Sequence, residues 1–190
     1  MTNECLAKLI AKGLIETGIE GAYSSVAETT NEEESYPSIG VSQWEGSRAD
    51  ELLSRISGGE KFIGMTYPEI ILNDMLDELE ELLDSPEGQE QQLQLLAEDC
   101  IEYVEEVQLE GLFNPQCIVY AGMWCPTSTY CVCNCISLAQ RDGVNINNLE
   151  ELSGYFYDRY AYVAGVEEYI DGYQNRSDNS YEYVEENVND

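Results

Sequence analysis

The sequence predicts a mainly α-helical domain in which a short irregular or β-hairpin segment lines a cleft. Apolar residues recur with the 3.6-residue period of amphipathic helices through most of the chain. The stretch 22–46 is the exception, because it is rich in Gly, Ser and Thr and lacks that period. With 190 residues, 43% of them hydrophobic, the chain is long and apolar enough to bury a sizeable core.

Each helix expected in the first half has an apolar stripe and a recognisable end. The first stops near Gly18 or Gly21, the second begins at Ser47 as N-cap and ends at Gly58-Gly59, and the third closes at Ser85-Pro86. Their inward residues, in chain order, are Leu6, Leu9, Ile10 and Leu14; Ala49, Leu52, Leu53 and Ile56; and Met75, Leu76, Leu79, Leu82 and Leu83.

Further helices are expected in the second half. A stripe from Leu93 to Val107 predicts one of them, and the apolar residues 116–123 predict a buried one. Asn114 suits the N-cap of that buried helix and Pro115 its first position. A final helix is expected over about residues 150–173, with Phe156, Tyr160, Val163, Val166 and Ile170 facing inward.

The end of the chain sets the expected domain boundary. Residues 177–190 are polar and acidic, which is typical of a flexible tail. The domain is therefore expected to comprise residues 1–176. No segment is apolar over the length that spans a bilayer, and the N-terminus lacks a secretory signal pattern, so synthesis in the cytoplasm is expected.

The charge is the most unusual property of the composition. Thirty-eight Asp and Glu stand against 8 Lys and Arg, with no His, for a formal net charge of −30. Nucleic acids and anionic membranes are therefore not expected as partners, because both are bound through cations. The absence of His excludes a His general base, a His triad and a His-ligated zinc site.

Most of these charges are expected to be solvated or paired locally. The acidic run 74–81 suits the outer face of a helix, and mimicry of nucleic-acid phosphate is the alternative. Arg48 and Arg55 are expected to pair with nearby acids such as Glu45 or Glu51.

The seven cysteines are expected to be reduced and mostly buried as small hydrophobic residues. Their number is odd, and the C-x-C-x-C spacing of the central cluster is not that of a zinc site. No metal and no cofactor are therefore predicted, with a metal or redox site and a disulfide as alternatives. The residues are Cys5, Cys100, Cys117, Cys125, Cys131, Cys133 and Cys135.

The residues that suit catalysis lie between positions 20 and 49. Glu20 stands near the end of the first helix and is followed by a glycine. A carboxyl there, facing an aromatic-lined cleft, would be partly desolvated, which raises its pKa and allows it to donate a proton. Glycoside cleavage needs such an acid at the leaving-group oxygen. A solvated helix-terminal Glu20, a core Trp44 and a capping Gln43 are the alternative interpretations.

Two motifs here resemble a known family. E-G-x-Y-x-S-V, from Glu20, and S-I-G-x-x-Q-W-x-G-x-R-A-x-x-L-L, from Ser38, resemble the lysozyme-like peptidoglycan hydrolase domain of Gram-positive bacteria and their phages. That domain is distantly similar to goose-type lysozymes and lytic transglycosylases. The resemblance covers about residues 5–173 and is strongest over 20–53. It implies a lysozyme-like fold, Glu20 as the catalytic general acid, and a substrate-binding set of Tyr23, Ser38, Gln43, Trp44 and Glu45.

The chain departs from the family pattern at two places and in its overall charge. A short turn that supplies a second carboxylate in the family is replaced by a longer acidic segment, so that the second group is one of Glu28, Glu32, Glu33 and Glu34. The family's Gln-Trp-His-Gly has Glu45 in place of the His. This extra carboxyl either raises the pKa of Glu20 by like charge or marks a loss of activity.

The resemblance implies an enzyme, a glycoside hydrolase that acts on peptidoglycan. It would cleave the β-1,4 bond between N-acetylmuramic acid and N-acetylglucosamine, as a muramidase or a lytic transglycosylase, with water or the muramic 6-hydroxyl completing the reaction. As a phage endolysin or virion protein, it would reach the cell wall through a holin or by virion delivery.

The alternative is an inactive acidic phage protein that binds a basic host protein, as a DNA mimic or an anti-defence inhibitor. Carboxylates gathered on one face would favour that alternative, and carboxylates spread evenly would favour the hydrolase.

Overall fold

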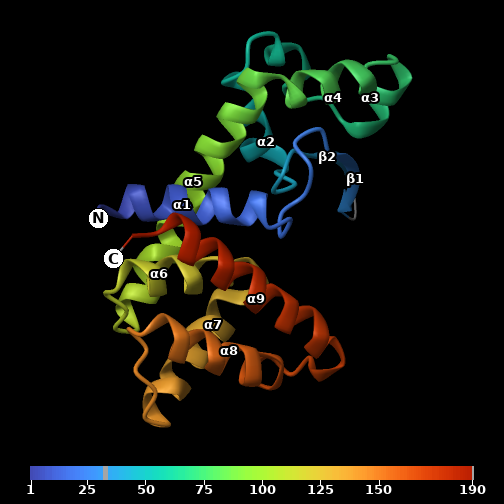
Figure 1. The fold of residues 1–190 in the computed structure, drawn as a ribbon. Helices are drawn as coiled ribbons and strands as arrows, with labels where there is room; N and C mark the ends of the chain where they lie inside the picture. The colour runs from blue at the N-terminus through green and yellow to red at the C-terminus, as the bar shows by residue number, and fades with distance from the viewer. Residues whose placement is uncertain (32–33, 190) are drawn as a thin grey trace. The chain divides into compact units, whose positions relative to one another are not determined.

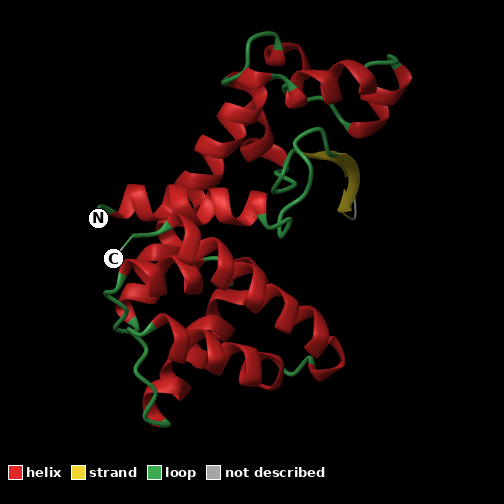
Figure 2. Ribbon diagram, viewed as in Figure 1, coloured by secondary structure: helices red, strands yellow, loops and turns green. Residues whose placement is uncertain are grey.

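The computed structural model describes residues 1–31 and 34–189 and is mainly α-helical (Figures 1 and 2). The fold class predicted from the sequence is confirmed at this level: helices with one small antiparallel hairpin. The elements are α1 (Asn3–Glu16), β1 (Val26–Asn31), β2 (Glu34–Ile39), α2 (Gly46–Ser54), η1 (Gly59–Phe62), α3 (Tyr67–Leu72), α4 (Leu76–Asp84), α5 (Pro86–Leu109), α6 (Pro115–Gly122), α7 (Cys125–Arg141), α8 (Leu149–Ala164), η2 (Glu167–Tyr169) and α9 (Ile170–Asn187).

The chain forms two compact units where the sequence predicted one domain. The larger unit comprises residues 1–19 and 97–190, and the smaller unit comprises residues 20–96. Helix α1 belongs to the larger unit because it packs against α6 and α9, which come from the other end of the chain. Helix α5 contributes its first turns to the smaller unit and its last turns to the larger one.

The larger unit is built around α6, whose residues 117–122 are all buried. Asn114 accepts a hydrogen bond from the Gln116 N–H and Pro115 occupies the first position, as the sequence predicted. Helices α7 and α8 pack against each other, as do α8 and α9. Helices α6, α8 and α9, with the residue before α7, contribute an aromatic cluster, which consists of Tyr120, Trp124, Phe156, Tyr160 and Tyr173.

The smaller unit contains the hairpin, α2, α3, α4 and the first turns of α5. Strands β1 and β2 pair in a register that runs from Val26↔Ile39 to Asn31↔Glu34, so the irregular or hairpin segment predicted from the sequence is confirmed. In α4, Leu79 and Leu83 are buried. Of the five acidic residues of the same helix, Asp77, Glu78, Glu81 and Asp84 are exposed and Glu80 is half-buried, so the predicted solvated face is also confirmed.

Two helix boundaries differ from the prediction. Helix α2 begins at Gly46 with Glu45 as N-cap, so Ser47 lies inside its first turn, and the helix ends at Ser54, before Gly58-Gly59. The predicted final helix is interrupted at Gly165, whose φ of 69° is left-handed and ends α8.

The C-terminal segment also differs from the flexible tail predicted for residues 177–190. Helix α9 continues to Asn187, and Ser177, Ser180, Tyr183 and Val184 are buried along one side of it. These inward positions recur at helical spacing among acidic residues. Composition alone conceals them, because the charges lie on the outer side of the same helix. None of the described helices is long and apolar enough to cross a membrane.

Candidate functional site

Glu20 lies in the segment that joins α1 to β1, where the smaller unit begins. Helix α1 ends at Glu16, so Glu20 is four residues beyond it and not in its last turn. The residue is half-buried.

A backbone hydrogen bond brings this segment against the turn after β2. The Gly21 N–H donates to the Val41 carbonyl at 2.8 Å, and the Gly40 N–H donates to the Ser25 carbonyl at 2.7 Å. A Cβ at position 21 would stand 3.2 Å from the Val41 oxygen, so this approach favours glycine. The two motifs that carry the family resemblance are therefore adjacent in space.

The Gly40–Gln43 segment is a tight turn closed by a pair of backbone hydrogen bonds. The Ile39 N–H donates to the Trp44 carbonyl and the Trp44 N–H to the Ile39 carbonyl, both at 3.0 Å. Gln43 has a φ of 52°, and its Nε2 donates to the Gly40 carbonyl at 2.9 Å. The Gln43 side chain thus stabilises the turn.

The side chain of Gln92, in α5, stabilises this turn through hydrogen bonds, a role that the sequence did not predict. Its side chain is fully buried. Gln92 Oε1 accepts the Val41 N–H at 3.0 Å, and Nε2 donates to the Leu83 carbonyl at 2.9 Å. A Cβ at Gly40 would stand 2.4 Å from Gln92 Oε1. The sequence feature that could have identified Gln92 is a polar residue at an inward position of α5, one turn before the buried Leu95 and Leu96.

Ser38 links Glu45 to the hairpin. The Ser38 hydroxyl, on a residue only 3% exposed, donates to Glu45 Oε1 at 2.8 Å. It also hydrogen bonds with the Thr29 hydroxyl. Because Ser38 has a single hydroxyl proton, which goes to Glu45, Thr29 is the donor to Ser38. This chain of hydroxyls orients the exposed Glu45 carboxylate, and Thr29 was not among the predicted residues.

The remaining predicted residues are placed differently. Trp44 is only 7% exposed, so its ring packs in the core of the smaller unit, while Tyr23 is half-buried. Of the possible second carboxylates, Glu28 is exposed and accepts a hydrogen bond from the Ser35 hydroxyl at 2.6 Å. Glu32 and Glu33 lie outside the described residues, and only the backbone of Glu34 is described.

The cysteines are free thiols, and most of them are buried. Cys5 is exposed, Cys131 and Cys133 are half-buried, and Cys100, Cys117, Cys125 and Cys135 are buried. Burial raises the pKa of Cys125 and of Cys135 to about 12, which keeps both protonated at neutral pH. Across residues 1–31 and 34–189, no group of three or more Cys, Asp or Glu is arranged to hold a metal ion.

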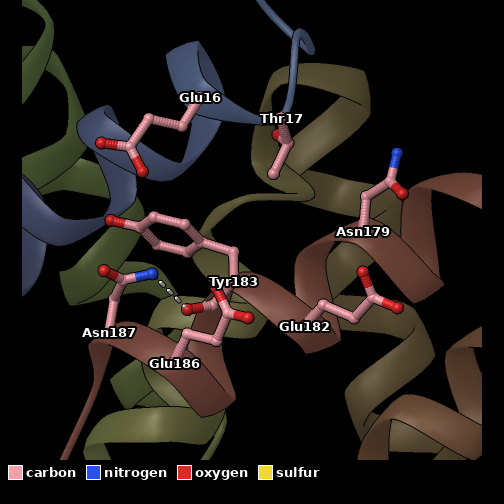
Figure 3. Close-up of a pocket in the computed structure, with 7 residues that line it drawn as sticks. All are labelled: Glu16, Thr17, Asn179, Glu182, Tyr183, Glu186 and Asn187. Carbon is pink, nitrogen blue, oxygen red and sulfur yellow. Dashed lines mark hydrogen bonds between the residues drawn. The ribbon is translucent and has the colours of Figure 1, made fainter.

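The larger unit has two adjoining hollows that the sequence did not predict. One, of about 340 Å³, has Glu16 on one side and Glu182, Tyr183 and Glu186 of α9 on the other (Figure 3). The second, of about 270 Å³, is lined by Tyr169, Tyr173 and Arg176, among others. Thr17 and Asn179 line both hollows.

Comparison with known proteins identifies no relative: no family model, no curated protein and no solved structure matches the chain.

Proposed function

We propose that this protein is a peptidoglycan hydrolase of the muramidase or lytic transglycosylase type, with Glu20 as general acid. The observation that carries the proposal is the 2.8 Å hydrogen bond from Gly21 to Val41. It holds the backbone next to Glu20 against the Gly-x-x-Gln turn, although the two segments are far apart in the sequence. The resemblance to lysozyme-like domains implies that both parts belong to the saccharide cleft.

The reaction begins with proton transfer from the Glu20 carboxyl to the oxygen that bridges N-acetylmuramic acid and N-acetylglucosamine. The bond from that oxygen to the muramic C1 then breaks, and positive charge develops on the sugar ring. Water attacking C1 gives a reducing end, whereas the muramic 6-hydroxyl attacking C1 gives an anhydro end. The proton released by the attacking oxygen passes to a carboxylate, which is Glu20 itself in the transglycosylase variant.

Glu45 is the second carboxylate that the structure favours for hydrolysis. It is exposed to solvent, and the Ser38 hydroxyl fixes one of its oxygens at 2.8 Å. Glu28 has a similar hydroxyl partner in Ser35 at 2.6 Å and is the other candidate. An oriented carboxylate that remains in contact with water can accept the proton of an attacking water molecule.

The distribution of the acidic residues also supports the hydrolase. Exposed carboxylates lie on α4 and the first turns of α5 in the smaller unit. They also lie on α8 and α9 in the larger unit. Carboxylates spread over both units are what the hydrolase interpretation expects.

The proposal is tested by turbidity loss and muropeptide release from purified Gram-positive peptidoglycan. Glu20→Gln keeps the shape of the side chain and removes the proton donor, so the rate should fall by about 10²-fold or more. Glu60→Gln, which removes an exposed carboxylate from the same unit, should retain the full rate. Failure of the wild-type protein on several wall types, across about pH 4 to 8, would exclude catalysis on this substrate.

A second candidate function is supported by one acidic face. Glu102, Glu106 and Glu110 line a hollow of about 560 Å³ together with Tyr130, which is 79% exposed. Their four-residue spacing places Glu102 and Glu106 on the same face of α5, and Glu110 follows one residue after the helix ends. Such a face would suit a basic partner and would not require Glu20.

A Lys-rich peptide serves as the probe for this second function. Binding should weaken with salt and should be lost when Glu102, Glu106 and Glu110 are changed to Gln. A matched triple change on α4, Asp77→Asn with Glu78→Gln and Glu81→Gln, removes the same charge elsewhere. Equal loss in both variants would show that only the net charge matters.

A further inference from the structure

The two adjoining hollows form one groove along a single face of α9. Gly172, Arg176 and Asn179 recur at three- to four-residue intervals on the helix, and Glu182 and Glu186 continue the series. Glu16, the last residue of α1, and the following residues 17–19 also line this groove. All of these residues belong to the larger unit.

One end of the groove carries a fixed cation. Arg176 Nη2 donates to the Met123 carbonyl at 2.5 Å, and the guanidinium carbon lies 5.6 Å from the centre of the Trp124 ring. Trp124 in turn stacks on Tyr173, with ring centres 6.0 Å apart and an interplanar angle of 18°. A guanidinium held in this way has little freedom to lose on binding, and its positive charge favours a carboxylate.

The surface beside Arg176 suits an organic ligand. Tyr169 is 62% exposed, and Tyr169 and Tyr173 both line this hollow. Asn175, also exposed, adds an amide donor and acceptor. Gly172 leaves the middle of this end open, because no atom lies within 4 Å of where its Cβ would stand.

The other end of the groove is acidic. Glu16 comes from α1, and Glu182 and Glu186 come from α9 (Figure 3). Tyr183 lies between them and donates its hydroxyl proton to the Leu9 carbonyl at 2.9 Å. Burial raises the pKa of Tyr183 to about 12, so its ring is a neutral part of the lining. No residue that lines this hollow is basic, and the three carboxylates favour a bound ammonium group.

The groove therefore has opposite charges at its two ends, at a separation that can be estimated from the helix. From Arg176 to Glu186, the α-helical rise of about 1.5 Å per residue gives about 15 Å. That is the length of about four residues of extended peptide.

We propose that the groove binds a short zwitterionic peptide, with a ligand carboxylate at Arg176 and a ligand ammonium at Glu182 and Glu186. The inference rests on the proposed function for the identity of this peptide. Peptidoglycan carries a stem of four or five residues on each muramic acid, with free carboxylates and, at its third residue, a diamino acid. The stem peptide thus carries the two opposite charges that the groove fits.

The test uses the soluble peptide N-acetyl-L-Ala-γ-D-Glu-L-Lys-D-Ala, whose blocked N-terminus matches the amide in the wall, titrated into the full chain by calorimetry or NMR. The Glu20→Gln variant is included beside the wild type. Acetylating the lysine amine or amidating the C-terminal carboxylate should each weaken binding about two- to fivefold, the range for one solvent-accessible ion pair. Equal affinity for the parent and both modified peptides, or no binding of any of them, would overturn the proposal.

Variants assign each charge to its end of the groove. Glu182→Gln with Glu186→Gln should remove the effect of acetylation, whereas Glu185→Gln with Asp178→Asn, a matched pair on α9 outside both hollows, should preserve it. Arg176→Gln should remove the effect of amidation. Since Arg176 also bonds the Met123 carbonyl, Tyr169→Ala is the second variant, and it should weaken binding of all three peptides. Identical behaviour of the two acidic pairs would contradict the assignment.

The outcome for the groove can be separated from the outcome for the enzyme. Peptide binding with the expected charge dependence, in a protein that does not cleave the wall, would retain the groove and reject the hydrolase. Wall cleavage that depends on Glu20, without peptide binding, would retain the hydrolase and reject the groove.

Discussion

Two regions, one in each unit, are stabilised by different means. In the larger unit, α6 is buried on all sides and the Trp124 ring lies 4.6 Å from Tyr160 and 5.2 Å from Phe156, between ring centres. In the smaller unit, the turn that carries the candidate site depends on the two hydrogen bonds of Gln92. In apolar packing, the stabilising free energy is the sum of many small contacts between atoms. In a buried hydrogen bond, it depends on one donor and one acceptor. A single change should therefore affect global stability in the first case and local geometry in the second.

The largest expected effect is that of Trp124→Ala in the aromatic cluster. The side chain is fully buried, so its removal should lower the free energy of unfolding by about 3–5 kcal/mol. Urea denaturation followed by circular dichroism measures the change. Tyr130→Ala, at a residue 79% exposed, should stay within about 0.5 kcal/mol. A loss under about 1 kcal/mol at Trp124 would show that the cluster is not a packed core.

Gly40→Ala should have the next largest effect, on the smaller unit. Its φ of 72° is unfavourable for alanine, and the new Cβ would meet Gln92 Oε1 at 2.4 Å. We expect a loss of about 2–3 kcal/mol from backbone strain and the displaced hydrogen bond. Gly154→Ala, within α8 and with open space around the new Cβ, should instead stabilise by up to about 1 kcal/mol. Effects of the same sign at both positions would contradict this account.

Gln92→Leu tests whether a buried amide positions the candidate site. It leaves the Val41 N–H and the Leu83 carbonyl without their partner, so the expected cost is about 1–3 kcal/mol. Wall-cleaving activity should fall even at temperatures where the variant is fully folded, because the turn beside Glu20 loses its support. Gln94→Leu, on the exposed side of α5, should change neither property. Full activity in a destabilised Gln92→Leu would assign Gln92 to stability alone.

The same contrast explains which features the sequence could reveal. The α6 cap at Asn114-Pro115 and the leucine face of α4 depend on residues within a few positions of one another, so their patterns were sufficient. The adjacency of Glu20 to the Gly40–Gln43 turn was expected only through family resemblance, because periodicity does not report contacts between distant segments.

Features that depend on distant partners were missed. Gln92 is recognisable as a support only when the Val41 N–H and the Leu83 carbonyl are seen beside it. Residues 177–190 have the composition of a tail because the buried Ser177, Ser180 and Tyr183 are polar or spaced among carboxylates. Burial of such residues is decided by the helices that cover them, which composition does not describe.

The smallest expected effect concerns the surface of the smaller unit. Arg48 Nη1 and Arg55 Nη2 each donate to Glu51 at 2.5 Å, which confirms the predicted pairing with Glu51 and lowers the pKa of that carboxyl below its ordinary value of 4.5. The folded state therefore binds the Glu51 proton more weakly than the unfolded chain does. The stabilisation is complete above about pH 4.5 and is lost as the pH falls through the lowered pKa of the folded state.

This contribution must be measured as a difference, because the whole chain responds to acid in the opposite direction. At a net charge of −30, protonating other carboxylates relieves repulsion and stabilises the compact state. The stability of the wild type relative to Glu51→Gln cancels that background. The difference should be positive at pH 7 and should shrink towards zero below the folded-state pKa of Glu51. A difference that stays constant with pH would mean that the two arginines do not stabilise the Glu51 carboxylate in solution.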